Sequence, residues 1–545
     1  MFSEPTLDCV VIGHHERDFR KVAADARQME QFSGVHNEIK TNSVLLGGER
    51  FTYPELLSRA VRDATGRDPQ LSIFRQPGFA VFYLTSFLRR HGHAAEPVNF
   101  FTMDKPRLRA LLARRPAAVA ITTTLYVDAT PVAEVVAFVR EHAPQTTVIV
   151  GGPHIYNLSE DHDRETQEFI FGQIGADVYI LDSQGEKTLH HVLDALKGGD
   201  GLASIPNLVY RDGPGFSRTP REPENNNLDA HLIDWSGFDP AFYRPSVYLR
   251  TARSCPFACS FCNYPTMAGK HVIASEDPLI TEMRFLKARG VRSILFIDDT
   301  FNVPLPRFKS LLRKMIAERF DFRWVSFFRC SNADDETFDL MQQSGCLGVF
   351  LGIESGDQRI LNAMNKSAKL DRYRYGIKRL NELGIVTLCS FIVGFPSEND
   401  ESARNTLEFI RETGPTFYTA QIYYHDLRSP IHQQARQYGI TSSGYSWTHD
   451  GMNWQDASAW VLRMIRDIPE STPIPLYNMS LWGLLYLVES GFSMPFLKEF
   501  CNIARDMMVA GYDDDNADQS AAYGRLQHLI LETHERATGG LACLT

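Results

Sequence analysis

The chain has 545 residues, of which 43% are hydrophobic and 22% charged, and its formal net charge is -10. This length is too great for one hydrophobic core, so we expect two to four domains. The modest acidity argues against nucleic acid as a partner, and the lack of an apolar run of ~20 residues argues against a membrane span.

The cysteines and the start of the chain indicate a cytoplasmic protein. The first five residues are acidic and lack the layout of a signal peptide. Nine cysteines are an odd count, and outside one cluster they are scattered singly, which is typical of a reducing compartment. Cys9, Cys346 and Cys389 lie in or beside apolar runs, so we expect them in the core.

Strands and helices alternate between residues 75 and 200. Buried strands are expected at 97–101, 117–122, 146–150 and 177–181, with helices at 78–91, 107–115, 131–142 and 185–196. This order predicts an α/β domain with a doubly wound, Rossmann-like parallel sheet. Residues 8–13 predict another buried strand, but the pattern from 14 to 70 is irregular, so residues 1–74 are interpreted as an N-terminal extension.

Ligands on such a sheet lie at the carboxyl ends of its strands. Three strand ends carry hydroxyls or glycines that suit this position: Thr122, Thr123, Thr124, Gly151, Gly152, Pro153, Gly185 and Glu186. The glycine pair lets a backbone approach a ligand closely. The alternative is a Rossmann-like sheet whose loops hold nothing.

Residues 201–242 are rich in Pro, Gly, Asn and Asp and predict a linker with a short hairpin.

Three cysteines follow this linker, Cys255, Cys259 and Cys262, at the spacing C-x3-C-x2-C. Thiolates favour zinc or iron–sulfur sites. A structural zinc site needs four ligands, and no fourth Cys or His lies within a few residues. Three thiolates suit a 4Fe-4S cluster with one open iron, whereas the alternative is a structural metal knuckle or three unrelated thiols.

Residues 243–426 repeat a strand–helix unit six times. Strands are expected at 247–253, 293–297, 323–328, 347–352, 387–393 and 417–424. This is a partial (β/α)6 barrel, in which chemistry belongs at the carboxyl ends of the strands. The residues there, together with the aromatic residue before the last cysteine, are Phe261, Asp298, Asp299, Arg329, Glu354, Ser355, Gly394 and Phe395.

Residues 427–545 predict a helical C-terminal domain that closes the open side of the barrel. It begins with an aromatic-rich segment, 445–454, whose tryptophans we expect in the core. His449 is either an acid–base group or, more simply, a packed histidine.

The cysteine spacing with Phe261 resembles the signature of the radical S-adenosylmethionine (radical SAM) superfamily. The run from Arg329 through Gly-Ile-Glu-Ser-Gly to Gly-Phe-Pro-x-Glu resembles the subfamily that places a cobalamin-binding domain before the barrel, and residues 75–200 resemble that domain. One departure is the absence of the D-x-H-x-x-G motif, so no histidine from that motif would hold cobalt.

The resemblance implies three cofactors. Cys255, Cys259 and Cys262 would hold a 4Fe-4S cluster. The strand-end residues of the barrel would bind S-adenosylmethionine, with Arg329 on its carboxylate, Glu354 or Ser355 on its ribose and the Gly394 backbone on its adenine. The strand-end residues of the first sheet would bind cobalamin. A flavodoxin- or ferredoxin-like protein would supply low-potential electrons.

The implied activity is that of a cobalamin-dependent radical SAM methyltransferase, which passes a methyl group from methylcobalamin to an unactivated carbon or a phosphinate phosphorus of a small molecule. The segment 444–454 and the chain start resemble methylases of antibiotic biosynthesis, including phosphinate P-methylases. The alternatives are a ring-forming or rearranging enzyme with the same cofactors and a cobalamin or iron–sulfur sensor without turnover. No catalytic side chain is assigned.

Overall fold

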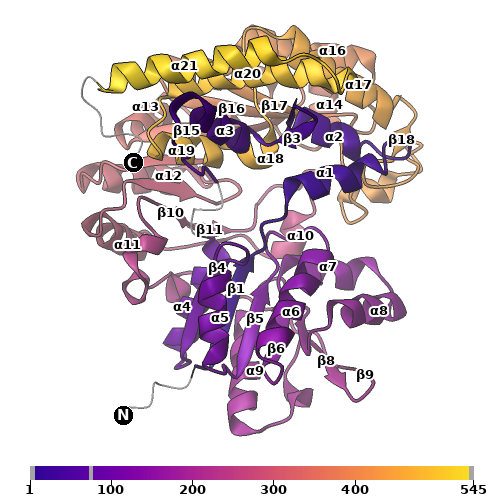
Figure 1. Ribbon diagram of the computed structural model, residues 1–545, viewed down its shortest axis with the longest axis vertical. Helices are drawn as coiled ribbons and strands as arrows, with labels where there is room; N and C mark the ends of the chain where they lie inside the picture. The colour runs from indigo at the N-terminus through magenta and orange to yellow at the C-terminus, as the bar shows by residue number, and fades with distance from the viewer. Residues whose placement is uncertain (1–6, 73–77, 539–545) are drawn as a thin grey trace.

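The computed structural model describes residues 7–72 and 78–538 and is built around two seven-stranded sheets (Figure 1). The first sheet lies in the lower half of the view and the second in the upper half. Among the described helices, none combines the length and apolar character that crossing a bilayer demands.

The first sheet has the strand order β4-β1-β5-β6-β7-β8-β9, of which the first five strands are parallel. Its strands are β1 (Cys9–His14), β4 (Ala95–Phe100), β5 (Ala118–Thr122), β6 (Thr147–Gly151), β7 (Val178–Ile180), β8 (Leu208–Asp212) and β9 (Gly215–Arg218). The expected doubly wound α/β sheet is therefore confirmed, because β1 lies between β4 and β5 and reverses the strand order there.

Helices cover both faces of this sheet because alternate strand residues face opposite sides. Val11 and Ala120 share a core with α4 (Phe79–Arg90) and α9 (Glu186–Gly198). Val10 and Val119 share the other core with four helices, α5 (Lys105–Ala113), α6 (Thr130–His142), α7 (Pro153–Asp161) and α8 (Arg164–Ile174). Helices α7 and α8 were not among the elements expected from the sequence.

Two expected domain boundaries differ from the structure. Residues 1–74 are not one extension, because β1 is an inner strand that pairs with β4 and β5 on either side. The range 201–242 is only partly a linker, because its hairpin pairs antiparallel through β8 with β7 and enlarges the sheet. Both differences arise from strand pairing between distant segments, which local sequence does not encode.

The second sheet is a parallel, partly open barrel with the order β10-β13-β14-β15-β16-β17-β20. Its strands are β10 (Ser246–Leu249), β13 (Ser293–Phe296), β14 (Arg323–Phe327), β15 (Cys346–Glu354), β16 (Val386–Val393), β17 (Phe417–Ile422) and β20 (Thr472–Pro473). The first six are the expected six, and short β20 adds a seventh. The connecting helices are α11 (Glu276–Ala288), α12 (Leu305–Ala317), α13 (Asp335–Gln343), α14 (Gln358–Ala363), α15 (Leu370–Glu382) and α16 (Asp400–Thr413).

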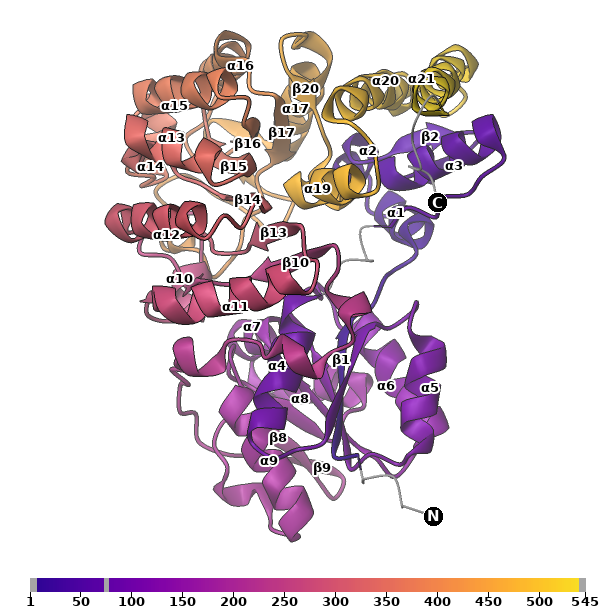
Figure 2. The same cartoon turned by 90° about the vertical axis from the view of Figure 1, so that its left-hand side faces the viewer.

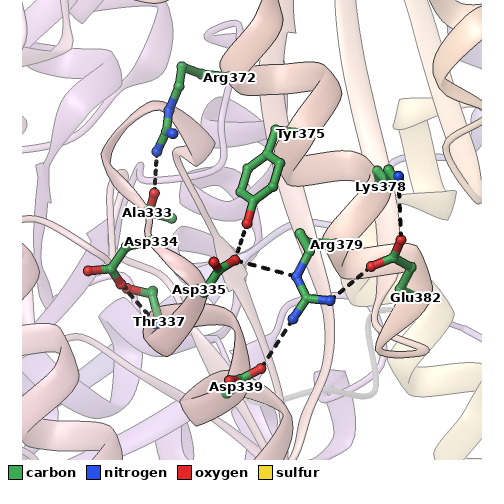
Figure 3. A network of polar contacts seen from close by, with 10 residues as sticks. All are labelled: Ala333, Asp334, Asp335, Thr337, Asp339, Arg372, Tyr375, Lys378, Arg379 and Glu382. Atoms are coloured by element: carbon green, nitrogen blue, oxygen red, sulfur yellow. Dashed lines mark hydrogen bonds and ion pairs between the residues drawn. The ribbon is translucent and has the colours of Figure 1, made fainter.

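A polar network ties α13 to α15 beside the turn that follows β14 (Figure 3). Arg379 pairs with Asp339 (3.3 Å) and Asp335 (3.6 Å), and the Tyr375 hydroxyl donates to Asp335. Arg372 donates to the backbone oxygen of Ala333. The Arg372 bond holds the turn that follows Arg329, and the other contacts hold α13 against α15. Together they support the position of Arg329 at the carboxyl end of β14.

The open side of the barrel is covered by the C-terminal helices and by the elements that lie between β1 and α4 in the chain (Figure 2). The C-terminal helices are α17 (Trp454–Asp467), α18 (Leu476–Met479), α19 (Leu481–Glu489), α20 (Met494–Asp513) and α21 (Ser520–Thr538). The N-terminal elements beside them are α1 (Phe19–Arg27), α2 (Val35–Thr41), β2 (Val44–Leu46), β3 (Glu49–Phe51) and α3 (Tyr53–Thr65). Tyr53 packs edge-on against Phe500 at 5.8 Å, and the Tyr523 hydroxyl donates to Asp63 at 2.8 Å. Residues 35–72 therefore lie with the C-terminal helices, whereas residues 15–17 still contact the first domain through Glu134, Thr102 and Asp128.

Glu38 on α2 joins this N-terminal segment to the barrel, because its carboxylate accepts the backbone N–H of Ile422 on β17 at 2.7 Å. Burial raises the pKa of Glu38 to about 7. A carboxyl whose pKa is raised in the folded state contributes stability that is fully present below its unfolded pKa and is lost as the pH rises through about 7.

Replacing Glu38 by Gln keeps the acceptor for Ile422 and removes the ionisation. We expect a higher thermal midpoint than the wild type at about pH 8, with a gain of at most about 3 kcal/mol that disappears towards about pH 5. Anaerobic melting curves over this range measure the difference. Glu30→Gln, at a largely exposed position nearby, is the control. Parallel curves for the wild type and Glu38→Gln would contradict the expectation.

Candidate functional site

The three clustered cysteines lie on one loop between β11 (Ala252–Arg253) and α10 (Tyr264–Ala268), after barrel strand β10. All three are free thiols, with Cys259 buried and Cys255 and Cys262 partly exposed. The Cys255 sulfur lies 3.3 Å from the Thr300 hydroxyl, which follows the next strand, β13. The loop therefore presents its thiols at the carboxyl end of the barrel, as expected.

Asp298 fixes the start of this loop. Its carboxylate accepts the backbone N–H groups of Thr251 (2.6 Å) and Ala252 (2.9 Å) and the Thr251 hydroxyl (2.5 Å). The expectation that Asp298 contacts S-adenosylmethionine is thus corrected, because these three donors and Arg307 nearby already satisfy this buried carboxylate. Its role is to orient the chain that leads to Cys255.

The middle of the loop is held by the turn after α14. Ser260 donates its backbone N–H to Met364 (2.9 Å) and its hydroxyl to Ala363 (3.0 Å), and the Asn365 amide donates to Ala258 (2.7 Å). These bonds flank Cys259 on both sides. The cysteine loop is thus anchored by barrel elements far along the chain.

Arg329 has the clearest features of a ligand-binding residue. Its side chain is buried, yet Nε and Nη2 have no hydrogen-bond partner among the described residues. The guanidinium carbon lies 3.6 Å from the ring centroid of Phe257, within the cysteine loop. Asn302 holds the Arg329 backbone with two hydrogen bonds, of 2.9 and 3.0 Å. Because burying unsatisfied charged donors is costly, a forked guanidinium in this position suits a carboxylate that arrives with a ligand.

Glu354 and Ser355 have different surroundings. Glu354 forms a buried ion pair with Lys366 (2.8 Å), whose ammonium lies 5.5 Å from the ring centroid of Phe261. The pair leaves the second Glu354 oxygen available. The Ser355 hydroxyl accepts the Asp357 N–H (3.1 Å) and lies 3.3 Å from that of Thr406, so it ties the strand end to α16. This corrects the expectation that Ser355 binds ribose.

Gly394 also has another role than expected, because both of its backbone groups are already bonded to side chains. Glu398 accepts its N–H, and His449 Nε2 lies 3.1 Å from its carbonyl oxygen. The backbone of Gly394 therefore cannot read an adenine edge as it stands. Phe395 is fully buried and packs edge-on against Tyr423, so it is a core residue. His449 is a packed histidine.

Replacing Gly394 by Ala tests this structural role. A Cβ here would lie 2.2 Å from Cη2 of Trp447, and φ is +92°, so we expect the variant to lose at least about 2 kcal/mol of stability. Its folded fraction should bind S-adenosylmethionine as the wild type does. Gly172→Ala is the matched control, because nothing lies within 4 Å of its Cβ position. A stable Gly394→Ala protein with selectively weakened binding would restore the adenine role.

A cavity of about 560 Å³ lies between the two sheets. The carboxyl ends of β5 and β6 and the start of α9 form one wall, the residues after β10 and β13 form another, and α19 contributes Trp482. The walls are mostly apolar with a few polar groups, which is typical of a ligand site. The cavity reaches the cysteine loop through Tyr264 and Met267, which closely follow Cys262.

Most of the strand-end residues expected to bind cobalamin line this cavity: Thr122, Thr124, Gly151, Gly152, Pro153, Gly185 and Glu186. Thr123 does not. Its hydroxyl donates to Gly151 (2.9 Å) and accepts the His154 N–H (3.2 Å), so this expectation is corrected. Thr122 and Thr124 lie 3.1 Å apart at their hydroxyls and face the cavity together.

The cavity wall is braced by the segment between the sheets. Asn226 is buried and donates to Glu186 (2.6 Å), while its carbonyl accepts from Arg253 (2.9 Å), two residues before Cys255. Burial raises the pKa of Glu186. Glu224 accepts the N–H groups of Lys187 (3.0 Å) and Thr188 (2.8 Å) and so caps the N-terminus of α9. Residues 222–226 are therefore held in place by hydrogen bonds to α9 and to the segment before Cys255, and do not form a flexible linker.

Sequence reasoning missed several residues of the cavity. His14 ends β1, and burial together with neighbouring His15 lowers its pKa to about 4. Arg250 follows β10 and lies 4.5 Å from the ring centroid of Tyr83. Asp299, by contrast, was expected from the sequence as a strand-end site residue; it lines the cavity, and burial raises its pKa to about 7. The position of His14 and Arg250 at strand ends is the signal that could have found them.

The comparisons with known proteins agree with this geometry. Residues 249–410 match the model of the radical SAM superfamily. The chain is 28% identical to an uncharacterized methyltransferase of Pyrococcus horikoshii over 53% of its own length and 62% of that protein. It is 24% identical to the anaerobic magnesium-protoporphyrin IX monomethyl ester cyclase of Rubrivivax gelatinosus over 52% of each. The chain thus spans between about half and two thirds of these curated relatives.

Two solved structures extend the likeness beyond the barrel. The radical S-adenosylmethionine methyltransferase TsrM of Kitasatospora setae, solved with cobalamin and a 4Fe-4S cluster, aligns over 85% of this chain and 97% of its own, with a TM-score of 0.58 and 19% identity. The cobalamin-dependent radical enzyme OxsB, solved with aqua-cobalamin and S-adenosylmethionine, covers 98% of this chain and 80% of its own, with a TM-score of 0.61 and 12% identity.

The chain therefore contains a radical SAM domain. Its fold as a whole, a Rossmann-like sheet followed by a partial barrel and C-terminal helices, is similar to the folds of TsrM and OxsB.

Proposed function

We propose that this protein is a cobalamin-dependent radical SAM methyltransferase that methylates an unactivated carbon or a phosphinate phosphorus of a small molecule. The observation that carries the proposal is the cavity of about 560 Å³ between the glycine-lined strand ends of the first sheet and the cysteine loop of the barrel. The methyltransferases among the relatives and solved structures support the same activity.

The donor sets of the chain fit the three cofactors. The thiols of Cys255, Cys259 and Cys262 would hold a 4Fe-4S cluster, and the unpaired Arg329 donors would bind the carboxylate of S-adenosylmethionine. The paired hydroxyls of Thr122 and Thr124 and the exposed backbone at Gly152 would bind cobalamin. When bound, these cofactors supply a substrate radical and the methyl group that it receives.

The chain itself binds and orients the reactants and excludes water from them. Phe79, Leu84 and Tyr248 make the cavity wall apolar, so a radical formed there is shielded from solvent. Arg250 and Asp299 are charged groups that face the cavity and could orient a polar substrate. A flavodoxin- or ferredoxin-like donor would supply the two electrons that one turnover consumes.

The balance of the reaction provides its test. The hydrogen that leaves the substrate ends in 5′-deoxyadenosine, and the methyl group comes from a second S-adenosylmethionine, which becomes S-adenosylhomocysteine. Candidate substrates can be chosen from the biosynthetic steps that the neighbouring genes encode. Anaerobic turnover with the right substrate should give 5′-deoxyadenosine and S-adenosylhomocysteine in proportion to the methylated product. With trideuteromethyl S-adenosylmethionine, the product should carry all the deuterium once the bound methyl pool has turned over.

A ring-forming reaction is the second candidate, favoured by the likeness to the cyclase of Rubrivivax gelatinosus. It would give 5′-deoxyadenosine without matching S-adenosylhomocysteine and a product of unchanged carbon count. Absence of 5′-deoxyadenosine from a fully reconstituted protein would instead favour a sensor. The same turnover experiment therefore separates all three possibilities.

A further inference from the structure

A group of histidines lies on the outer part of the first domain, beyond the cavity. His91 and His93 stand in the turn between α4 and β4, and His190 lies on α9 with Asp194 one helical turn further on. The ring centroids of His91 and His190 are 4.7 Å apart, and those of His93 and His190 are 5.1 Å apart. Nothing in the proposed radical chemistry uses these side chains.

Three donor atoms of this group converge. His93 Nε2 lies 2.8 Å from His190 Nδ1 and 3.6 Å from a carboxylate oxygen of Asp194. One ligand atom from each of the three residues can be chosen so that all lie within 4.8 Å of one another. A tetrahedral zinc ion with bonds of about 2.0–2.1 Å spaces its ligand atoms about 3.3 Å apart. The separations of His93 Nε2 from its two partners, 2.8 and 3.6 Å, lie on either side of that spacing.

We propose that His93, His190 and Asp194 form a binding site for a zinc-class divalent transition metal ion. Two imidazoles and a carboxylate are a ligand set that such ions accept, with water in the fourth position. Asp194 is exposed, so the ion has a path from solvent, whereas His93 is buried and fixes one ligand. Buried Nδ1 of His93 has no hydrogen-bond partner among the described residues.

The charges around the group agree with binding. Lys197, one turn beyond Asp194, is paired with Asp8 at 2.7 Å, so its charge is partly neutralised. Asp194 interacts with both histidines, at 3.6 Å from His93 and 3.4 Å from His190 Nε2, and supplies the negative charge of the site. Without a metal, one of the two imidazoles must donate a hydrogen bond to the other, and the contact between His93 and Asp194 is long, at 3.6 Å.

The position of the site suggests what the ion does. The early part of α9, with Glu186 and Leu189, lines the cavity, and so does the first part of α4. His190 and Asp194 lie in the middle part of α9, directly after Leu189, and His93 lies in the turn after α4. A bound ion would join α9 to the end of α4 and stiffen one wall of the cavity. This role is structural and does not depend on the proposed methyl transfer.

The test uses the full chain without an affinity tag, reconstituted with its iron–sulfur cluster so that the cluster thiols are occupied. It is treated with a chelator, titrated anaerobically with zinc chloride and passed through a desalting column, and zinc and iron are counted by mass spectrometry. We expect about one zinc ion per chain at micromolar zinc. His190→Ala and Asp194→Ala should each weaken binding at least about tenfold with unchanged iron.

The control is His528→Ala on α21. His528 and Glu532 are another helical His–acid pair one turn apart, 2.9 Å between Nε2 and Oε1, but no third ligand is near them among the described residues. This variant should bind zinc as the wild type does. X-ray absorption at the zinc edge should show nitrogen and oxygen ligands without sulfur. Equal zinc binding by the wild type and both site variants, or none at micromolar zinc, would overturn the proposal.

Discussion

Replacing Cys259 by Ala is expected to abolish assembly of the iron–sulfur cluster and all formation of 5′-deoxyadenosine. Each thiolate would hold one iron, so loss of one ligand of three removes the cluster rather than weakening it. Cys259 is buried, and the loop around it is anchored through Ser260 and Asn365, so its thiol is held in a fixed position. Iron content and the electronic spectrum after anaerobic reconstitution measure the effect.

Cys389→Ala is the control for this experiment. Cys389 is a fully buried residue of β16, and burial raises the pKa of its thiol, as expected for a core cysteine. The variant should keep its iron content and lose only stability through the small cavity that it creates. A full cluster in Cys259→Ala, or loss of iron in Cys389→Ala, would contradict the assignment of the ligands.

Replacing Arg329 by Ala is expected to weaken binding of S-adenosylmethionine about a hundredfold. Hydrogen bonds between a buried guanidinium and a carboxylate are charge-assisted, and losing them costs about 3 kcal/mol. The affinity of Arg329→Lys for S-adenosylmethionine should lie between those of the wild type and Arg329→Ala, because lysine keeps the charge but cannot make the paired hydrogen bonds of a guanidinium. Equilibrium binding of labelled S-adenosylmethionine to the reconstituted protein gives the dissociation constants.

The ligand-free stability of Arg329→Ala provides a second, independent readout. Because two donors of the buried guanidinium are unpaired, its removal should not lower the thermal midpoint in the absence of S-adenosylmethionine. Addition of S-adenosylmethionine should then raise the thermal midpoint of the wild type more than that of the variant. Partly exposed Arg374, which pairs with Glu412 at 2.9 Å, supplies the control variant Arg374→Ala. Unchanged binding with a lower midpoint would show Arg329 to be a structural residue.

The strand-end residues show how far sequence reasoning can be taken. The positions at strand ends were identified from the apolar runs before them, and most of the eight residues in the first domain line the cavity. Thr123 does not, because residues beside one another in extended chain face opposite sides, so Thr122 and Thr124 face the cavity while Thr123 faces the protein. This part of the site could have been predicted from the alternation alone.

Other errors could not have been avoided in this way. Asp298, Ser355 and Gly394 stand at strand ends as expected, but Thr251, Thr406 and Glu398 take up their bonding groups. Such partners come from other strands and loops. A strand-end polar residue can orient the loop beside it or bind a ligand, and only the location of its partners decides between these roles.

The sequence by itself determined the two α/β units, the six principal barrel strands and the three thiols, because these depend on local periodicity and on spacing within a few residues. The tertiary structure alone decided that β1 is an inner strand of the first sheet, that residues 35–72 lie with the C-terminal helices, and that two donors of Arg329, unpaired among the described residues, lie beside the cysteine loop. These features arise from pairing and packing between segments up to several hundred residues apart, for which the local sequence carries no signal.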